Sequence, residues 1–325
     1  MREKPMNRTP LVFIPGLFGS MSNVIVPGTG NWSFGIAGAV YDPFVHLLES
    51  MDYQRNVNLF ISFYDWRLPV PFSAYNYLAP TIREAKQKTG SAKVNLVCHS
   101  MGGLVARAYV QSNYYQDDVD QLIILCTPNA GSPANYCYWT GNTLEHDSES
   151  PLNVVSLYMN KYLSYLISIS AMNKLESIHV YFPSLLDLVP CKDYGDYLIV
   201  AGIDLMKVIP YRILQVKNVF LDELNEHKEI IRMRNIDVTL IAGIGRNTTQ
   251  YLQSVNDPLP NIRMERAVWS AISSNAGDGN VMVSSVFVLD GDKYLIQGDH
   301  MEVLFRSESL LRKKLSYVQL SFTLD

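Results

Sequence analysis

Residues 94–109 read Val94-Asn95-Leu96-Val97-Cys98-His99-Ser100-Met101-Gly102-Gly103-Leu104-Val105-Ala106-Arg107-Ala108-Tyr109. An apolar run passes through a turn of small residues into a helical pattern. Gly102 and Gly103 lack the β-carbons that would collide where a strand and a helix turn sharply apart. This context predicts a nucleophile elbow with Ser100 at its apex, although Cys98 replaces the first glycine of Gly-x-Ser-x-Gly. The alternative, a Ser-Gly loop that only caps a helix, leaves the preceding strand unexplained.

The composition indicates one globular unit with an insertion. Of the 325 residues, 48% are hydrophobic and 18% are charged, so the chain can bury a large core and lacks the charge excess of disorder. The net charge is −4 and the Lys and Arg residues are scattered, which gives no reason to expect nucleic acid as a partner. The 20 Tyr, 12 Phe and 12 Met fit either a large core or a pocket for an apolar ligand.

The N-terminus and the cysteines bear on compartment and on metals. Residues 1–6 are charged and lack the apolar core of a secretory signal, so we expect a cytoplasmic protein on the chain as given, or a secreted one if a leader was removed. No transmembrane segment is predicted, and a transient contact with a lipid interface is left open, as is the oligomeric state. No metal or other cofactor is predicted, because metal-ligand spacing is absent and buried thiols are expected at Cys98, Cys126, Cys137 and Cys191.

Strand and helix signals alternate around the elbow. Strands are predicted at residues 11–14, 57–63, 121–126 and 236–243, with helices at residues 41–51 and 74–89. Such alternation with long crossovers predicts a parallel sheet covered on both faces. In serine hydrolases of this topology, the loop after the first strand supplies one oxyanion-binding amide and the residue after the nucleophile supplies the other. This nominates the amides of Leu17 and Met101, with an ordinary strand-to-loop turn as the alternative for the first.

Residues 135–235 break the pattern, because strand signals fade and helical stretches dominate. We expect a helical cap, or lid, inserted between two parts of the core, residues 1–134 and 236–325. One helix of the cap carries apolar residues at spacings of three and four, namely Leu152, Val155, Met159, Tyr162, Leu166 and Ile169. Its other face is also apolar, so it is either packed on two sides or a lipid-facing lid. Candidates for the substrate pocket are Phe18, Met159 and Leu166.

Two residues near the C-terminus complete the candidate site. Asp278 lies in a glycine-flanked loop, and His300 precedes the last predicted helix after a predicted hairpin of residues 286–289 and 294–297. The order Ser100, Asp278, His300 is that of nucleophile, acid and base, with a plain turn aspartate as the alternative at 278. The other histidines are weaker candidates, because each lies beside the elbow, on a predicted surface helix or in the cap: His99, His46, His146, His179 and His227.

Taken together, these motifs resemble the lecithin:cholesterol acyltransferase-like branch of the lipases within the α/β hydrolases. The matching stretches are Ile14-Pro15-Gly16-Leu17-Phe18-Gly19-Ser20, Tyr64-Asp65-Trp66-Arg67, the elbow at residues 98–103, and residues 127–132, 182–190 and 277–281. The resemblance implies an α/β-hydrolase fold with a mostly parallel sheet, helices on both faces and a helical cap over the acyl pocket. It also implies a serine enzyme that cleaves acyl esters of lipids.

We therefore predict a serine ester hydrolase, a lipase or carboxylesterase, that forms an acyl-enzyme on Ser100 with His300 as base and Asp278 orienting the imidazole. A phospholipase or lipid acyltransferase would use the same residues and differ in the acceptor. From another class, a catalytically inactive hydrolase-fold binding module is the alternative, and the retention of all three residue types in order speaks against it. The expected partner is a lipid or other apolar ester substrate.

Overall fold

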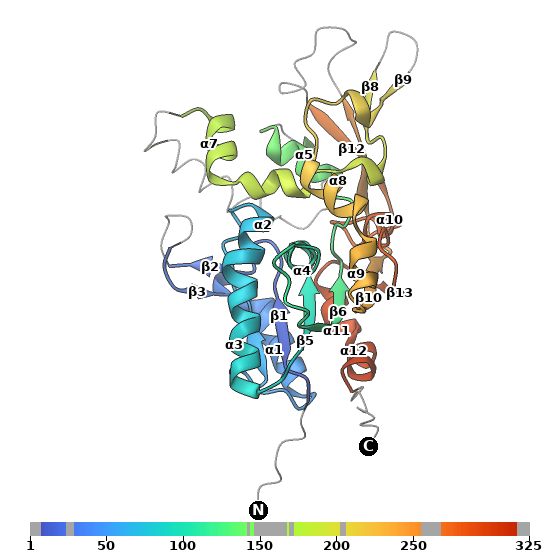
Figure 1. Ribbon diagram of the computed structural model, residues 1–325. Helices are drawn as coiled ribbons and strands as arrows, with labels where there is room; N and C mark the ends of the chain where they lie inside the picture. Colours follow the sequence, from blue (N-terminus) through green and yellow to red (C-terminus); the bar gives the residue numbers. More distant parts are fainter. Residues whose placement is uncertain are drawn as a thin grey trace, which may run out of the picture.

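The computed structural model describes residues 8–23, 29–141, 144–145, 168, 172–201, 206–254 and 268–316. Its centre is a six-stranded sheet in the order β13-β10-β6-β5-β1-β4 (Figure 1). Every neighbouring pair in this sheet is parallel, which confirms the prediction of a parallel sheet. Its strands are β1 (Leu11–Ile14), β4 (Leu59–Ile61), β5 (Val94–His99), β6 (Val119–Leu125), β10 (Asp237–Ile244) and β13 (Asp292–Gln297).

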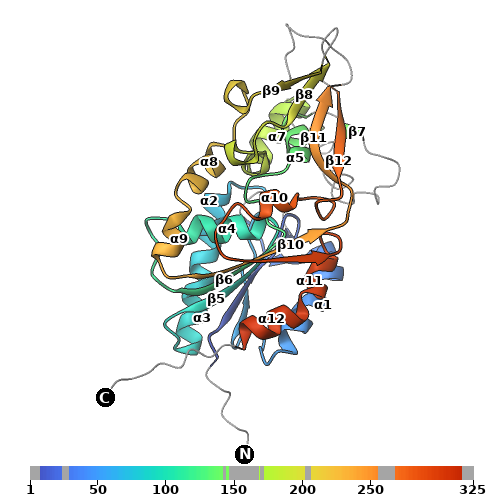
Figure 2. The same cartoon turned by 90° about the vertical axis from the view of Figure 1, so that its right-hand side faces the viewer.

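Helices cover both faces of this sheet (Figure 2). Strand β1 shows the reason, because its fully buried side chains alternate between two core clusters. Leu11 and Phe13 belong to the cluster with α1, α11 and α12, whereas Val12 and Ile14 belong to the cluster with α3, α4 and α9. A strand that is buried on both faces needs such a continuous apolar run. The helices are α1 (Gly38–Glu49), α3 (Ala79–Thr89), α4 (Met101–Val110), α9 (Glu229–Met233), α11 (Glu302–Arg306) and α12 (Glu308–Leu315).

A second sheet of five strands, in the order β7-β12-β11-β8-β9, lies beyond the carboxyl ends of the first (Figure 2). Helix α5 (Pro133–Trp139) packs against it, with the Tyr136 ring 5.9 Å from the Trp269 ring. Three of its strands, β7, β8 and β9, fall within residues 135–235, so that region is not purely helical. The strands are β7 (Leu144–Glu145), β8 (Leu198–Ala201), β9 (Met206–Ile209), β11 (Thr248–Ser254) and β12 (Trp269–Ser274).

The predicted hairpin of residues 286–289 and 294–297 is wrong. The first segment begins at the last residue of helix α10 (Val283–Val286) and goes on as a turn, and β13 pairs in parallel with β10, with Thr239 opposite Asp292. The apolar character of the first segment reflects core packing, because Leu289 is buried in the cluster on the α4 side of the main sheet.

The remaining elements are short: β2 (Met21–Ser22), β3 (Trp32–Ser33), η1 (Gly35–Ala37), α2 (Val70–Ser73), the π-helical turn η2 (Ala74–Leu78), α7 (Lys174–Tyr181), η3 (Pro183–Leu188), η4 (Lys192–Tyr194), η5 (Tyr211–Ile213) and α8 (Val219–Glu226). The predicted buried thiols are present, since all four cysteines are buried and none is in a disulfide. Within the described ranges, no helix has the length and apolar character needed to cross a bilayer.

Candidate active site

Ser100 stands at the turn between β5 and α4 in a backbone conformation that serine rarely adopts. Its φ is 53° and its ψ is −129°, a combination that persists only where the surroundings enforce it. Its amide donates to the Leu125 carbonyl at 2.8 Å, and its own carbonyl accepts from Thr127 Oγ1 at 2.6 Å. A β-carbon on Gly102 would overlap the Ile14 carbonyl oxygen. The predicted elbow is therefore present, with Ser100 at its apex.

Asp278 and His300 form a buried pair next to the elbow. His300 Nδ1 lies 2.7 Å from Asp278 Oδ2, and the His300 amide donates to the Asp278 carbonyl at 2.9 Å. The other carboxylate oxygen accepts from the amides of Asn280 and Val281 at 2.8 and 2.7 Å. Burial alone would raise the pKa of Asp278, but the His300 imidazole and these hydrogen bonds outweigh burial and lower that pKa. The carboxylate therefore stays ionised and holds a proton on Nδ1, which leaves Nε2 as the basic nitrogen.

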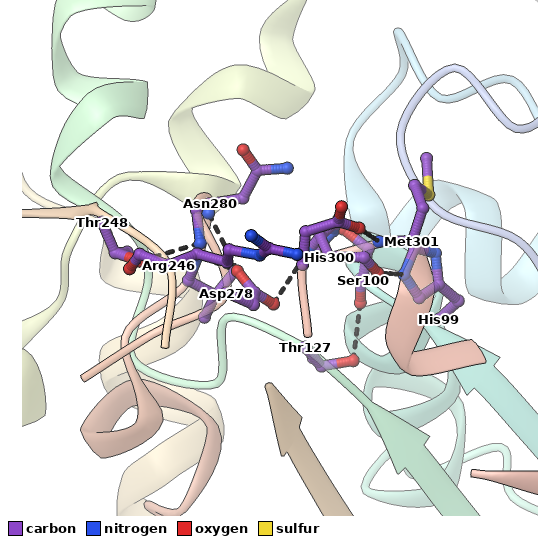
Figure 3. Close-up of polar contacts among 12 residues, drawn as sticks. His99, Ser100, Thr127, Arg246, Thr248, Asp278, Asn280, His300 and Met301 are labelled. Carbon is purple, nitrogen blue, oxygen red and sulfur yellow. Dashed lines mark hydrogen bonds and ion pairs between the residues drawn. The ribbon is translucent and has the colours of Figure 1, made fainter. Parts of the chain in front are cut away.

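The structure brings together the three predicted catalytic residues from distant parts of the chain. Figure 3 shows His300 between Asp278 and Ser100 in that view. Among the described residues, Ser100 Oγ has no hydrogen-bond partner. Catalytic hydrogen bonds of unliganded enzymes are commonly long and tighten only with substrate. The arrangement supplies a half-buried hydroxyl, an imidazole and an orienting carboxylate.

The loop after β1 lies directly against the elbow. A β-carbon on Gly16 would come within 2.7 Å of the Ser100 β-carbon, and Phe18 adopts a φ of 61°. Leu17 follows Gly16 in this loop, and Met101 is the first residue of α4, so its amide belongs to those that have no acceptor within the helix. Both predicted oxyanion-binding amides thus belong to segments that adjoin Ser100.

The Tyr64–Arg67 stretch supports this loop, a role that the sequence pattern alone did not indicate. The Tyr64 hydroxyl donates to the Pro15 carbonyl at 2.9 Å, and the Trp66 ring lies 4.3 Å from the Phe18 ring. Asp65 and Arg67 form a buried pair through two contacts of 2.8 Å. The sequence signals were the run of aromatic and charged residues after a predicted strand and its resemblance to a family motif, and neither indicates this contact with the loop.

A buried polar network connects the loop after β6 to the segment that carries Asp278. Ser132 Oγ donates to the Asn280 carbonyl at 2.8 Å, and Ser285 Oγ donates to the Gly131 carbonyl at 2.7 Å. Asn129 Nδ2 donates to the Val286 carbonyl at 2.8 Å. This network holds the acid loop against the edge of the sheet at which the elbow stands.

Cys126 adds a potential metal ligand beside the pair. One ligand atom from each of Cys126, Asp278 and His300 lies within 4.8 Å of the other two. Burial and then the nearby Asp278 carboxylate raise the pKa of the Cys126 thiol well above its usual value. A protonated thiol is a poor metal ligand, and Asp278 and His300 already satisfy each other. The donor set therefore fits an acid–base pair with a buried thiol beneath it better than a metal site.

The remaining candidates lie in four different settings. Phe18 is buried against Trp66 at the edge of the site, whereas Met159, Leu166 and His146 lie outside the described residues. His46, His179 and His227 are exposed on or next to helices. His99 is fully buried and lies behind the elbow with its ring 4.7 Å from that of His300.

Comparison with known proteins supports the fold. Residues 33–146 match the family model of lecithin:cholesterol acyltransferase, which is just over a third of the chain. No curated protein sequence matches the chain. The mature lipase BlEst2 of Bacillus licheniformis superposes with a TM-score of 0.52 at 15% identity, over 97% of this chain and 95% of that one.

Two other solved structures are less similar. EstA from Clostridium botulinum gives a TM-score of 0.45 at 12% identity, over 97% of this chain and 88% of that one. The lin2722 product of Listeria innocua gives a TM-score of 0.44 at 12% identity, over 96% of each chain.

The parallel sheet, the elbow and the likeness to BlEst2 lead to one conclusion: this chain has the α/β-hydrolase fold and, over residues 33–146, is similar to the lecithin:cholesterol acyltransferase family.

Proposed function

We propose that this protein is a serine hydrolase that cleaves acyl esters of lipids. The observation that carries the proposal is the ionised Asp278 holding His300 Nδ1 at 2.7 Å beside a serine in a strained elbow. An aspartate that only closes a turn would not need a buried histidine as its partner. A fold that serves only as a binding module has no use for the backbone strain at Ser100.

In the proposed reaction, Ser100 Oγ attacks the ester carbonyl carbon while His300 Nε2 accepts the hydroxyl proton. The carbonyl oxygen becomes an oxyanion held by the amides of Leu17 and Met101. The tetrahedral intermediate collapses, the alcohol leaves with the proton from His300, and an acyl ester remains on Ser100. Water then attacks the acyl-enzyme with the same base, and the carboxylic acid is released. Asp278 stabilises the imidazolium through Nδ1 and is not itself protonated.

The Ser100→Ala variant tests the proposal. We expect the wild-type protein to hydrolyse p-nitrophenyl acyl esters and a fluorophosphonate probe to label Ser100, as mapped by mass spectrometry of the digested protein. The variant should lose both properties and keep its thermal unfolding temperature, because one oxygen is removed from a half-buried apex. Labelling of a different serine, or turnover by Ser100→Ala near that of the wild type, would contradict the assignment.

The match of residues 33–146 to an acyltransferase family favours one second candidate, transfer of the acyl group to a lipid alcohol. Both reactions share the acyl-enzyme and differ in the nucleophile that resolves it. Incubation with a phospholipid donor, with and without a sterol or other lipid alcohol, distinguishes them. A new ester in the lipid extract indicates transfer, and free fatty acid alone indicates hydrolysis.

We also propose that residues 135–235 act as a cap over the acyl pocket. Support comes from a row of aromatic side chains in contact that joins the cap to the proposed oxyanion loop. The Trp66 ring lies 4.3 Å from Phe18 on one side and 5.5 Å from Phe182, which follows α7, on the other. This contact gives the cap an apolar attachment beside Ser100, where an acyl chain needs apolar walls.

A further inference from the structure

His99, the residue before the proposed nucleophile, is the centre of a buried hydrogen-bond chain. Its Nε2 lies 2.9 Å from the His300 carbonyl oxygen. A carbonyl oxygen only accepts hydrogen bonds, so His99 Nε2 must carry the proton. The other ring nitrogen, Nδ1, is then an acceptor. His99 is fully buried, and this burial, followed by the proximity of His300, lowers its pKa to about 3. The imidazole is therefore neutral, and its tautomer is set by its neighbours.

Tyr41 extends the chain on the other side. Its hydroxyl lies 2.8 Å from His99 Nδ1 and accepts a hydrogen bond from the Gly16 amide at 3.0 Å. The amide can only donate, so the Tyr41 proton must point to His99. One orientation satisfies every atom: Gly16 N–H to Tyr41 Oη, Tyr41 O–H to His99 Nδ1, and His99 Nε2–H to the His300 carbonyl. Hydrogen bonds aligned in this way polarise and strengthen one another.

The two ends of this chain are backbone atoms of the two loops that the proposed reaction depends on. Gly16 directly precedes Leu17, whose amide is assigned to the oxyanion, and His300 is the assigned base. Between these ends the hydrogen-bond chain passes behind Ser100. Gly16 itself is a close neighbour of the Ser100 β-carbon. Figure 3 shows the His99 end of the chain, with its dashed line to the backbone of the segment at residues 300 and 301.

We propose that Tyr41 and His99 are positioning residues that fix the oxyanion loop and the base loop relative to each other. This inference rests on the proposed function, because it assigns a role in the same reaction. Neither side chain touches the reacting atoms. Their effect is geometric, and displacement of a catalytic group by about 1 Å can lower turnover on the order of 100-fold.

The Tyr41→Phe variant tests the proposal with a minimal change. It keeps the ring that packs against Phe13 and Phe34 and removes the oxygen that joins Gly16 to His99. We expect kcat per titrated active site to fall on the order of 10- to 100-fold with KM unchanged within about twofold. The adduct of a trifluoromethyl ketone with Ser100 places an oxyanion in the same site. The affinity of the variant for this ketone should therefore fall by a similar factor.

Tyr109→Phe is the matched control. The Tyr109 hydroxyl is also buried and donates to Asp118 Oδ1 at 2.7 Å, but it lies in α4 away from the elbow. This variant should lower the thermal unfolding temperature and leave kcat per titrated site and ketone affinity unchanged. If Tyr41→Phe behaves like Tyr109→Phe, the hydrogen-bond chain only satisfies buried polar atoms and the proposal is overturned.

His99 gives an independent measurement. His99→Gln retains an amide that can donate to the His300 carbonyl but cannot hold the ring geometry toward Tyr41. It should lower kcat per titrated site, and the Tyr41→Phe/His99→Gln pair should cost little beyond the worse single change, since both interrupt one chain. If the losses in kcat of the two single variants multiply in the double variant, the two side chains do not act through one hydrogen-bond chain. If Tyr41→Phe does not fold, His99→Gln is judged by the same kcat and ketone criteria against Tyr109→Phe.

The experiments distinguish an error in the proposed function from an error in the positioning role alone. If the proposed function is wrong, the wild-type protein lacks esterase turnover or its labelling by fluorophosphonate does not map to Ser100. If only the positioning role is wrong, the wild type is active and labelled at Ser100 while the Tyr41 and His99 variants keep wild-type kcat per titrated site.

Discussion

Arg107 Nη2 donates to Asn225 Oδ1 at 2.7 Å and so joins the helix behind the elbow to α8, 118 residues further along the chain. The Arg107 guanidinium is completely buried, and among the described residues its acceptors are neutral oxygens, supplied by Gln111, Asn129, Leu224 and Asn225. Burial lowers the pKa of Arg107 to about 9, so the cation persists at neutral pH. Both the elbow helix and the loop after β6 depend on this one side chain.

Replacement of Arg107 should therefore destabilise the whole protein. We expect Arg107→Met, which keeps most of the side-chain volume, to lower the free energy of unfolding by about 3 kcal/mol or more, because buried amide oxygens of Asn129 and Asn225 lose their donor. Urea denaturation followed by circular dichroism measures this loss. Arg306→Met, at an exposed ion pair with Glu302, should change it by less than about 1 kcal/mol. Equal effects of the two variants would contradict the inferred role.

The proposed catalytic residues should behave as one unit. Single alanine substitutions of Ser100, Asp278 and His300 should each lower kcat on the order of 10³-fold or more, and the combined variants should lose little beyond the worst single one. Steady-state kinetics on a p-nitrophenyl ester provide the measurement. Losses that multiply across the three sites would mean that they do not share one reaction step.

Asp187 should make the stability of the protein depend on pH. Burial raises its pKa from the usual 3.8 to about 7, even though the Val70 amide donates to Oδ2 at 2.7 Å. Between these two values the unfolded chain has lost the proton that the folded chain retains. The free energy of unfolding should therefore fall as pH rises from about 4 to about 7 and level off above that.

The Asp187→Asn variant removes this titration and keeps an oxygen for the Val70 amide. Its stability relative to the wild type should increase from pH 4 to pH 8 in urea denaturation. A difference between the two proteins that does not change with pH would show that Asp187 titrates normally in the folded state.

Chelators should leave the esterase activity unchanged, because a protonated Cys126 thiol beside a satisfied Asp278–His300 pair is a poor metal site. Activity after dialysis against EDTA, compared with activity after dialysis against buffer, measures this. Inhibition that added Zn²⁺ reverses would require a metal in the mechanism.

Chain-length preference tests the expected role of the cap helix, which stays a prediction because Met159 and Leu166 lie outside the described residues. Each buried methylene of substrate contributes ~0.8 kcal/mol, or roughly fourfold in specificity per carbon. Met159→Trp or Leu166→Trp should shorten the preferred acyl chain and spare acetate esters. If folded variants keep the wild-type profile of kcat/KM against chain length, these residues do not line the pocket.

The features that could be predicted from the sequence are those with a local signature. Buried parallel strands are continuous apolar runs, and the elbow is a strand, a small-residue turn and a helix in direct succession. The order of Ser100, Asp278 and His300 then followed from the loops that bear them. The structure places them together at the carboxyl edge of the sheet.

The features that could not be predicted depend on partners far away in the chain. An Asp-Gly-Asp turn between two apolar stretches indicates a hairpin locally, yet β13 pairs with β10, which lies about fifty residues earlier. Strand β11 is rich in Thr and Gln and gives no apolar run. The contacts of Tyr64 with Pro15 and of Tyr41 with His99 join segments that share no sequence pattern.

The second sheet draws its strands from both sides of the core strand β10: β7, β8 and β9 precede it, and β11 and β12 follow it. The last of these leads directly to the loop that carries Asp278. The part of the molecule above the main sheet is therefore not an interchangeable module. A chimaera that exchanged only residues 135–235 with a relative would replace β8 and β7, the parallel partners of β11 and β12, and would leave those two strands beside foreign neighbours. Any change to the second sheet of such a protein therefore involves two chain segments, one before β10 and one after it.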